Sequence, residues 1–220
     1  RGMPPEGVEA AILANPDAKA VLVNNPTYYG ICSDLRKIVE IVHRHGMKVL
    51  VDEAHGTHFY FGDGLPPSAM SCGADMASVS VHKTGGSLTQ SAILLLGKGI
   101  DPNYVRQIIN LTQTTSASYL LMVSLDLARQ NLALHGREFY AKTVEFADYA
   151  RKEINAIGGY YAFGEELCDG KAFYAFDRTK LSVHTRAMGL AGIEVYDLLR
   201  DEYDIQIEFG DIGNILAIIT

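Results

Sequence analysis

The sequence has few cysteines, no Cys-x-x-Cys spacing and no long apolar segment. Its three cysteines lie far apart at positions 32, 72 and 168, which argues against a zinc or dithiol redox site. A reducing compartment is the simplest interpretation, so we expect a cytoplasmic protein. No stretch approaches the roughly 20 apolar residues that span a bilayer, and the first residues lack the charged-then-apolar pattern of a secretory signal. We therefore expect no membrane partner.

Basic residues are also scarce and scattered. The chain has 19 Lys and Arg against 26 Asp and Glu, for a formal net charge of −7. Nucleic-acid binding needs basic patches, and no run of Lys or Arg occurs, so no nucleic-acid partner is expected. An acidic balance suits a cationic substrate, but bulk charge says little about a single pocket. The start without an initiator methionine and the stop after the apolar run 215–219 indicate a piece of a longer protein.

The first hundred residues alternate between helical and strand patterns. A continuous apolar run at 20–23 and the segment 48–51 predict strands buried on both faces, and the segments 76–81 and 92–96 predict further strands. Two helices are expected between them. Pro4 and Pro5 suit the first turn of one, with apolar residues at Val8, Ile12 and Leu13. Ser33 and Asp34 can cap the other, whose apolar stripe is Leu35, Ile38, Val39 and Val42. This pattern predicts an α/β fold with a largely parallel sheet, in which ligands collect at the carboxyl ends of strands.

The pattern changes beyond residue 101. Long helices are predicted at about 102–111, 118–134 and 137–157, the last closed by a glycine pair. From Tyr160 on, short strands return around a helix near 191–201, with final strands at 205–209 and 214–219. We therefore expect a major α/β domain over residues 1–135, followed by a linking helix and part of a smaller α+β domain over residues 136–220.

One segment combines hydroxyls, a histidine, a lysine and two glycines directly beyond an apolar strand. It runs from Ser78 to Ala92 with Lys83 near its centre. A lysine amine forms an imine with a carbonyl, while hydroxyls, backbone N–H groups and an imidazole suit a phosphate. An isolated His-Lys pair would most often be a solvated surface feature. The neighbouring glycines and hydroxyls instead favour the site of a phosphorylated aldehyde.

A second segment places an acid at the end of a buried strand. Asp52 follows the run 48–51, and an unpaired carboxylate buried there would be costly. A protonated pyridine nitrogen is a suitable cationic partner, and the pair keeps the ring an electron sink. The alternative is a helix cap or a structural hydrogen bond. The pair His55 and His58 resembles half a metal site, but two ligands are weak evidence for zinc, so no metal is predicted.

These residues resemble the Orn/Lys/Arg decarboxylase family of bacterial pyridoxal-phosphate enzymes, which has the aspartate-aminotransferase type of fold. The cofactor-attachment signature of that family is matched at Ser80, His82, Lys83, Gly86-Ser87, Thr89, Gln90 and Ser91-Ala92. The Asp52-Glu53-Ala54-His55 block resembles the ring-nitrogen motif of the family. The resemblance extends along nearly the whole chain and includes the stretch 112–116 and the block Asp177 to Leu181.

The resemblance implies a role for each motif residue. Lys83 would hold pyridoxal 5'-phosphate as a Schiff base, and Asp52 would keep its ring nitrogen protonated. Ala54 would pack beneath the ring, and His55 would lie near its phenolic oxygen. The phosphate would be contacted by Ser80 and His82. Thr115 and Ser116 would reach the phosphate of a neighbouring protomer, which implies a homodimer or higher homo-oligomer with a shared site.

The implied reaction is decarboxylation of a basic amino acid to an amine of the polyamine pathway. The phosphate loop and the ring-stacking residue of the family lie upstream of residue 1, so we expect this chain alone to bind the cofactor poorly. An aminotransferase, a carbon–carbon lyase of the same fold, or a non-catalytic relative remains open. The sequence does not choose between arginine, lysine and ornithine. The acids conceivable as partners of the distal cation are Glu53, Glu165, Glu166, Glu208 and Asp211.

Overall fold

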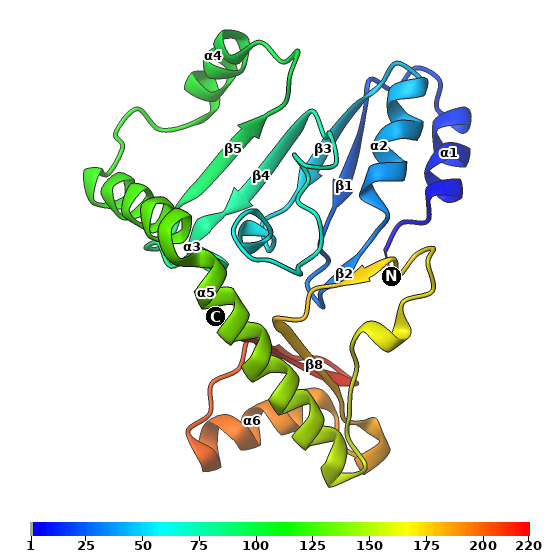
Figure 1. Cartoon of the computed structure of the whole chain (residues 1–220), viewed down its shortest axis with the longest axis vertical. Coiled ribbons are helices and arrows are strands. Elements are labelled where there is room, and N and C mark those ends of the chain that lie inside the picture. The colour runs from blue at the N-terminus through cyan, green and yellow to red at the C-terminus, as the bar shows by residue number, and fades with distance from the viewer. Residues whose placement is uncertain (1) are drawn as a thin grey trace.

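The computed structural model describes residues 2–220 and contains a four-stranded sheet in its first half. The strands are β1 (Ala20–Asn24), β3 (Lys48–Asp52), β4 (Met76–Ser80) and β5 (Ala92–Leu96). They lie side by side in that order, with β1, β3 and β4 parallel and β5 antiparallel to β4 (Figure 1). The predicted α/β architecture with a mostly parallel sheet is therefore confirmed.

One face of this sheet is covered by α1 (Pro5–Ala14) and α2 (Leu35–Arg44). The Asp34 side chain caps α2 by accepting a hydrogen bond from the N–H of Lys37 at 3.1 Å. The predicted apolar stripe of α2 is buried, and it packs against the sheet together with Val8 and Ile12. Leu13, which was expected on the buried side of α1, is 67% exposed. The main hydrophobic core thus lies between these two helices and the sheet.

The other face of the sheet is exposed in this chain. We call it the open face. It carries the side chains at alternate strand positions, namely Leu22, Leu50, Asp52, Met76, Ser78 and Leu94. Leu22 is 69% exposed, so the prediction that the first strands are buried on both faces is wrong for this chain. Apolar residues on both faces of a strand show only that it suits burial on both sides. Whether a second layer covers the sheet depends on other segments.

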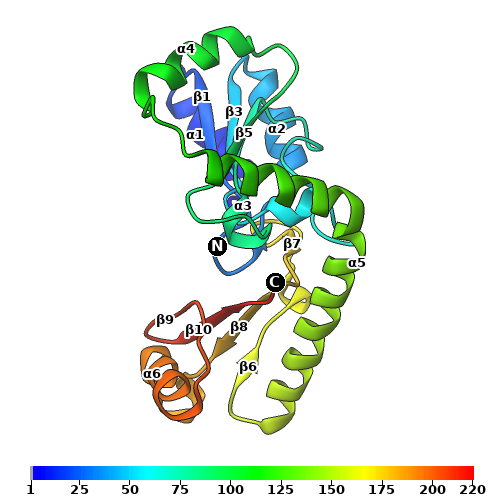
Figure 2. The same ribbon diagram turned by 90° about the vertical axis from the view of Figure 1, so that its left-hand side faces the viewer.

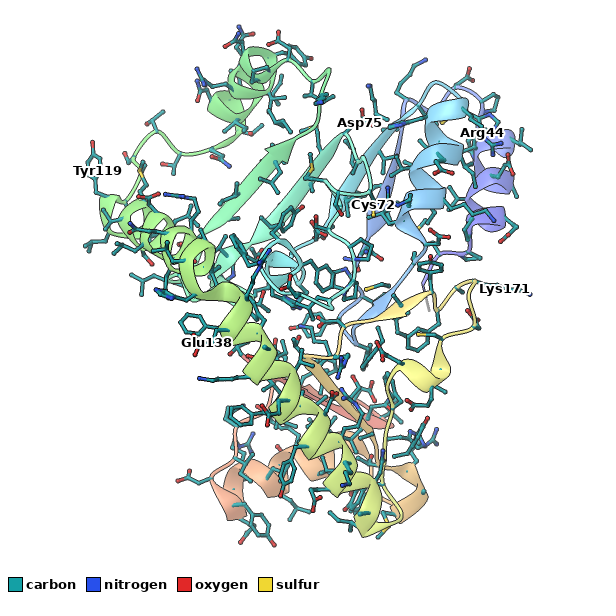
Figure 3. All side chains as sticks on the ribbon, viewed as in Figure 1. Arg44, Cys72, Asp75, Tyr119, Glu138 and Lys171 are labelled. Atoms are coloured by element: carbon teal, nitrogen blue, oxygen red, sulfur yellow. The ribbon has the colours of Figure 1, made fainter. Side chains whose placement is uncertain are left out.

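The second half begins with α4 (Pro102–Thr112), none of whose residues is buried, and α5 (Tyr119–Ile157). The prediction of two helices at 118–134 and 137–157 is wrong, because α5 is one helix of 39 residues. Gly136 continues it, and a Cβ atom there would lie 2.8 Å from the Cβ of Phe61. This glycine therefore permits close packing rather than ending the helix. Figure 2 shows α5 running from the sheet to the C-terminal half, and Tyr119 projects from its first turn (Figure 3).

The C-terminal half forms a second, antiparallel sheet in the order β6-β8-β10-β9, accompanied by α6 (Gly192–Tyr203). Its strands are β6 (Tyr161–Ala162), β8 (Lys180–His184), β9 (Phe209–Gly210) and β10 (Asn214–Ile218). The strand expected over 205–209 is mostly wrong, because residue 205 still closes the end of α6 by donating to Leu199 O. Hence an α+β unit packs below the first sheet (Figure 1).

Short elements connect the two halves. The strand pair β2 (Ile31–Cys32) and β7 (Ala175–Phe176) joins segments far apart in the chain. The helical turns are η1 (Thr57–Tyr60), α3 (Val81–Thr84), η2 (Glu165–Leu167) and η3 (Arg186–Met188). Within residues 2–220, no helix combines the length and the hydropathy needed to cross a membrane. All three cysteines are free thiols.

Candidate active site

The lysine segment is held in place by hydrogen bonds from both sides. β4 ends at Ser80, and Lys83 lies on the short helix α3 that follows. The backbone N–H of His82 donates to Ser91 O at 3.3 Å, and its ring Nδ1 lies 3.0 Å from the same oxygen. From the other side, the hydroxyl of Tyr140 on α5 donates to Thr84 O at 2.7 Å. These contacts fix the backbone that carries the lysine.

The segment after β3 lies directly beside it, because β3 and β4 are parallel neighbours with Asp52 opposite Ser78. The Asp52 carboxylate accepts a hydrogen bond from the N–H of Ala54 at 3.1 Å and is exposed. The expected burial of this carboxylate is therefore wrong for this chain. Its side chain lies on the open face, where the described residues provide no covering layer.

Glu53 points the opposite way, into the protein. It is 0% exposed and accepts hydrogen bonds from the hydroxyl of Tyr60 at 2.5 Å and the N–H of Ala69 at 2.8 Å. Burial raises its pKa to about 7, against the opposing effect of these two hydrogen bonds. Both carboxylate oxygens are occupied by the chain itself. Glu53 is therefore a structural residue and not a candidate partner for a substrate cation.

The amine of Lys83 lies 3.1 Å from Nε2 of His55. The other ring nitrogen, Nδ1, lies 3.3 Å from the amine of a second lysine, Lys180, at the start of β8. His55 is 6% exposed and Lys180 is 0% exposed. Burial, followed by the charges of Lys180 and Lys83, lowers the pKa of His55 to about 3. The imidazole between the two lysines is therefore neutral.

A second buried cluster lies beside the first. Nε2 of His58 is 2.9 Å from the carboxylate of Asp177, and its Nδ1 is 3.3 Å from the hydroxyl of Thr84. The hydroxyl of Thr179 donates to the same carboxylate at 2.8 Å. Burial acts to raise the pKa of Asp177, but His58 and then Lys180 hold it below its usual range. We call this region, where the two halves of the chain meet, the domain seam: Lys83, His55, Lys180, His58 and Asp177.

The two histidines thus contact different partners. His55 faces amines, whereas His58 faces a carboxylate and hydroxyls. Within residues 2–220, no group of three or more His, Cys, Asp or Glu side chains is arranged to hold a metal ion. His55 and His58 therefore belong to two separate hydrogen-bond networks.

The predicted site residues line two neighbouring cavities. One, of about 450 Å³, lies on the open face and is lined by Asp52, Ala54 and Ser80. The other, of about 460 Å³, lies between α3 and α5 and is lined by His82 and Lys83. Lys83 thus contacts His55, whereas Asp52, Ala54 and Ser80 line one cavity together. No direct hydrogen bond or ion pair between Asp52 and Lys83 occurs in the described part of the chain.

Thr115 and Ser116 are not brought to these cavities. Both are exposed in the linker between α4 and α5. The N–H of Ser116 donates to the hydroxyl of Thr114 at 3.2 Å, a local contact. Their predicted role toward a neighbouring protomer therefore stays a prediction.

The residues present suit pyridoxal 5'-phosphate. An amine for the aldehyde lies at Lys83 and a carboxylate for the ring nitrogen at Asp52, on adjacent strand ends. Ser80 and His82, on the same turn, carry a hydroxyl and an imidazole that would suit its phosphate. The hydroxyl of Ser87 is buried and, in the part of the chain that the structure describes, lacks a hydrogen-bond partner. An orphaned donor beside the glycine pair suits a polar ligand group that the chain itself does not provide.

Of the remaining acids, two lie near the seam. The Tyr28 ring packs 4.3 Å from the His55 ring, and its hydroxyl donates to Glu208, while the Tyr29 hydroxyl donates to Asp211. Asp211 also accepts from the N–H groups of residues 213 and 214. Glu208 is exposed and, in the described residues, Tyr28 is its one hydrogen-bond partner. Glu208 therefore has free acceptor capacity close to the seam.

The other two acids, Glu165 and Glu166, belong to η2 in the C-terminal half. Glu166 accepts from the hydroxyl of Tyr161 and the N–H of Gly164, both at 2.8 Å. These contacts tie it to β6 and not to the seam.

The sequence does not predict the contacts of Lys180, Asp177 and Tyr28 with the two histidines. In the sequence, the block from Asp177 to Leu181 stands out only through its resemblance to the family, which implies no role for it. The one available signal is that Lys180 opens a strand, β8, in which no position is exposed. A lysine at such a position is expected to be buried. A lysine is rarely buried without a partner. That pattern alone does not identify the partner as a residue 125 positions away.

Known proteins are similar to this chain along its whole length. It is 49% identical over 220 residues to an arginine decarboxylase of Halalkalibacterium halodurans and 46% identical to that of Bacillus subtilis. In both cases the match covers 100% of this chain and 45% of the relative. The chain thus spans less than half the length of these relatives.

Solved structures share the fold. A lysine decarboxylase of Francisella novicida matches with a TM-score of 0.78 and 19% identity, over 98% of this chain and 36% of that protein. A pyridoxamine–pyruvate aminotransferase of Mesorhizobium loti matches with a TM-score of 0.73 and 17% identity, over 99% of this chain and 58% of that protein. Residues 1–187 match the family described as Orn/Lys/Arg decarboxylase, major domain. The chain therefore belongs to the Orn/Lys/Arg decarboxylase family.

Proposed function

We propose that the protein carrying this chain is a cytoplasmic, pyridoxal-phosphate-dependent decarboxylase that converts arginine to agmatine and CO₂. The observation that carries the proposal is the 3.1 Å contact between the amine of Lys83 and the neutral imidazole of His55, beside the strand end that presents Asp52. The choice of arginine is supported by relatives named arginine decarboxylase at 44–49% identity. Three free cysteines favour a reducing compartment.

The bound cofactor would supply an electron sink for the pair of electrons released when the α-carboxylate leaves as CO₂. The residues of this chain would hold and tune it. Lys83 would attach the aldehyde, Asp52 would keep the ring nitrogen protonated, and Ser80 and His82 would bind the phosphate. Ala54 would pack beneath the ring. His55, neutral and in contact with Lys83, would exchange a proton with that amine and orient it.

We further propose that Glu208 binds the guanidinium of the substrate. Its one hydrogen-bond partner among the described residues is Tyr28, whose ring packs 4.3 Å from that of His55, and its charge acts on the neighbouring Lys180. A carboxylate that accepts one hydrogen bond from a tyrosine can still accept from a guanidinium. Glu208→Gln should raise the KM for arginine about tenfold or more and leave cofactor absorbance unchanged. An unchanged KM would assign the guanidinium to another group.

Thr115 and Ser116 would complete the site of a second copy of the chain in a homodimer. Their exposure, together with the exposed apolar residues of the first turns of α5, leaves this region free for such a partner: Tyr119, Leu120, Met122 and Val123. Mixing an inactive Lys83→Ala protein with an inactive double variant of Thr115 and Ser116 should restore activity, because hybrid dimers contain one intact site. No restored activity after confirmed subunit exchange would exclude a shared site.

A product assay on the full-length protein tests the reaction. Incubation with arginine should release CO₂ and agmatine, with slower turnover of lysine and ornithine. An absorbance band at about 420 nm should mark the protonated imine. Lys83→Ala should abolish both signals. Formation of a keto acid without CO₂ would indicate an aminotransferase, and an absent band would indicate a non-catalytic relative.

A further inference from the structure

The domain seam places one imidazole between two lysine amines. Lys83 lies on α3 in the first half of the chain and Lys180 on β8 in the second, and His55 bridges them with contacts of 3.1 and 3.3 Å. Lys83 is exposed, whereas Lys180 is 0% exposed. The seam therefore connects an accessible amine with an enclosed one through a single ring.

Hydrogen-bond chemistry restricts the protons in this triad. A neutral imidazole has one N–H donor and one acceptor nitrogen, and an ammonium group can only donate. If both lysines were ammonium groups, both ring nitrogens would have to accept, which a neutral ring cannot do. A charged ring would donate from both nitrogens and would need both lysines as free amines, but burial and the nearby lysines lower the pKa of His55 and disfavour that form. With a neutral ring, both contacts are hydrogen bonds only when at least one lysine is a free amine, and a single ammonium beside that amine satisfies both.

We propose that Lys180 is a positioning residue that shares one proton with Lys83 through His55. In one state the Lys83 ammonium donates to Nε2, and Nδ1–H donates to the free amine of Lys180. In the other, Lys83 has passed a proton to Nε2 and Nδ1 has passed one to Lys180. The net charge is the same in both. The second state leaves Lys83 with the lone pair it needs to attack a carbonyl.

The surroundings of Lys180 allow it to hold this proton in either state. Burial lowers its pKa, which favours release, while Asp177 and Glu208 oppose that effect and favour the charged form. The charged and titratable groups that face it come from five separate segments: His55, Asp177, Glu208, Lys83 and Cys32. A lysine balanced between burial and two carboxylates can act as both acceptor and donor.

The inference rests on the proposed role of Lys83, and reductive methylation of the cofactor-free, full-length protein tests it without turnover. Formaldehyde with cyanoborohydride methylates free amines, and mass spectrometry of the digest gives the rate at each lysine. Lys171, exposed on a loop far along the surface (Figure 3), serves as the internal reference. Cofactor-loaded protein should protect Lys83; if it does not, the proposed function fails independently of the role of Lys180.

Two substitutions at position 180 separate proton sharing from mere space filling. Lys180→Met keeps the length but removes the proton acceptor, so the methylation rate of Lys83 at pH 7 should fall about tenfold. Lys180→Arg keeps a permanent donor to Nδ1 of His55. The ring proton then stays on Nε2, and Lys83 remains a free amine. Its methylation rate should therefore stay within about twofold of that in the unmodified protein.

A space-filling role predicts the reverse order, because methionine fits an apolar gap better than the larger arginine. Thr179→Val changes the residue before Lys180 and removes the hydroxyl that donates to Asp177. It controls for general loosening of the seam and should leave the methylation rate of Lys83 unchanged. Equal rates for Lys83 in the methionine variant and the unmodified protein, or loss only in the arginine variant, would overturn the proposal.

Discussion

The domain seam and the open face hold the two halves of the proposed site in opposite environments. In the seam, His55, Lys180, His58 and Asp177 are buried and every one is hydrogen-bonded. On the open face, Asp52 is exposed and bonds only to the N–H of Ala54 in the described residues. This chain therefore organises the lysine half of the site by itself. The carboxylate half lies on a surface that the chain leaves uncovered.

The largest effect should come from the open face and appear only in catalysis. Asp52→Ala should reduce turnover of the full-length enzyme about 10³-fold, the scale of removing a major electrostatic stabiliser. Because the side chain is exposed in this chain, the free energy of unfolding should change by less than about 0.5 kcal/mol. Asp63→Ala removes a similarly exposed aspartate, which forms an ion pair with Arg137 at 3.5 Å, and should change neither quantity. A turnover loss below tenfold would show that Asp52 does not keep the ring nitrogen of the cofactor protonated.

The next largest effect should come from the seam and appear in stability. Asp177→Asn leaves the shape but removes the anion that His58 and Lys180 face in a fully buried site. Breaking a buried charge network by removing one partner costs about 3–5 kcal/mol, so urea denaturation should show a loss of that size. Asp126→Ala breaks an exposed ion pair with Arg129 and should cost less than about 1 kcal/mol. Similar losses for both variants would contradict the contrast between seam and surface.

A smaller effect concerns pH and Glu53, which lies between Asp52 and His55 in the sequence. Its pKa is raised above the ordinary 4.5 to about 7, so its stabilising contribution is fully present below pH 4.5 and is lost as pH rises through about 7. Each pH unit between the two values is worth about 1.4 kcal/mol, which gives a loss of roughly 3 kcal/mol. Glu53→Gln, an isostere of the protonated acid, should not show this loss. Parallel stability curves against pH for the two proteins would show that Glu53 is not the responsible group.

Much of the fold follows from the sequence because its patterns are local. The cap at Asp34 and the stripe of α2 specify that helix, and the runs at 48–51 and 92–96 specify β3 and β5. What failed depended on distant packing. The continuity of α5 through Gly136 depends on Phe61, and the exposure of Leu22 and Asp52 depends on whether another layer covers the sheet.

The site divides in the same way. The placement of Lys83 and Asp52 at adjacent strand ends can be predicted from the sequence, because parallel strands have their carboxyl ends at the same edge of a sheet. It did not reveal that His55 joins Lys83 to Lys180, since that contact forms only when the second half of the chain folds against the first. No local pattern encodes such a pairing.

The central claim is that Lys83 is the residue that binds the cofactor covalently. Borohydride reduction of the cofactor-loaded, full-length protein, followed by digestion and mass spectrometry, locates the attached pyridoxyl group directly. We expect it on the peptide containing Lys83, in the unmodified protein and in Asp52→Ala alike. A group attached to Lys180 or to any other lysine would contradict the account.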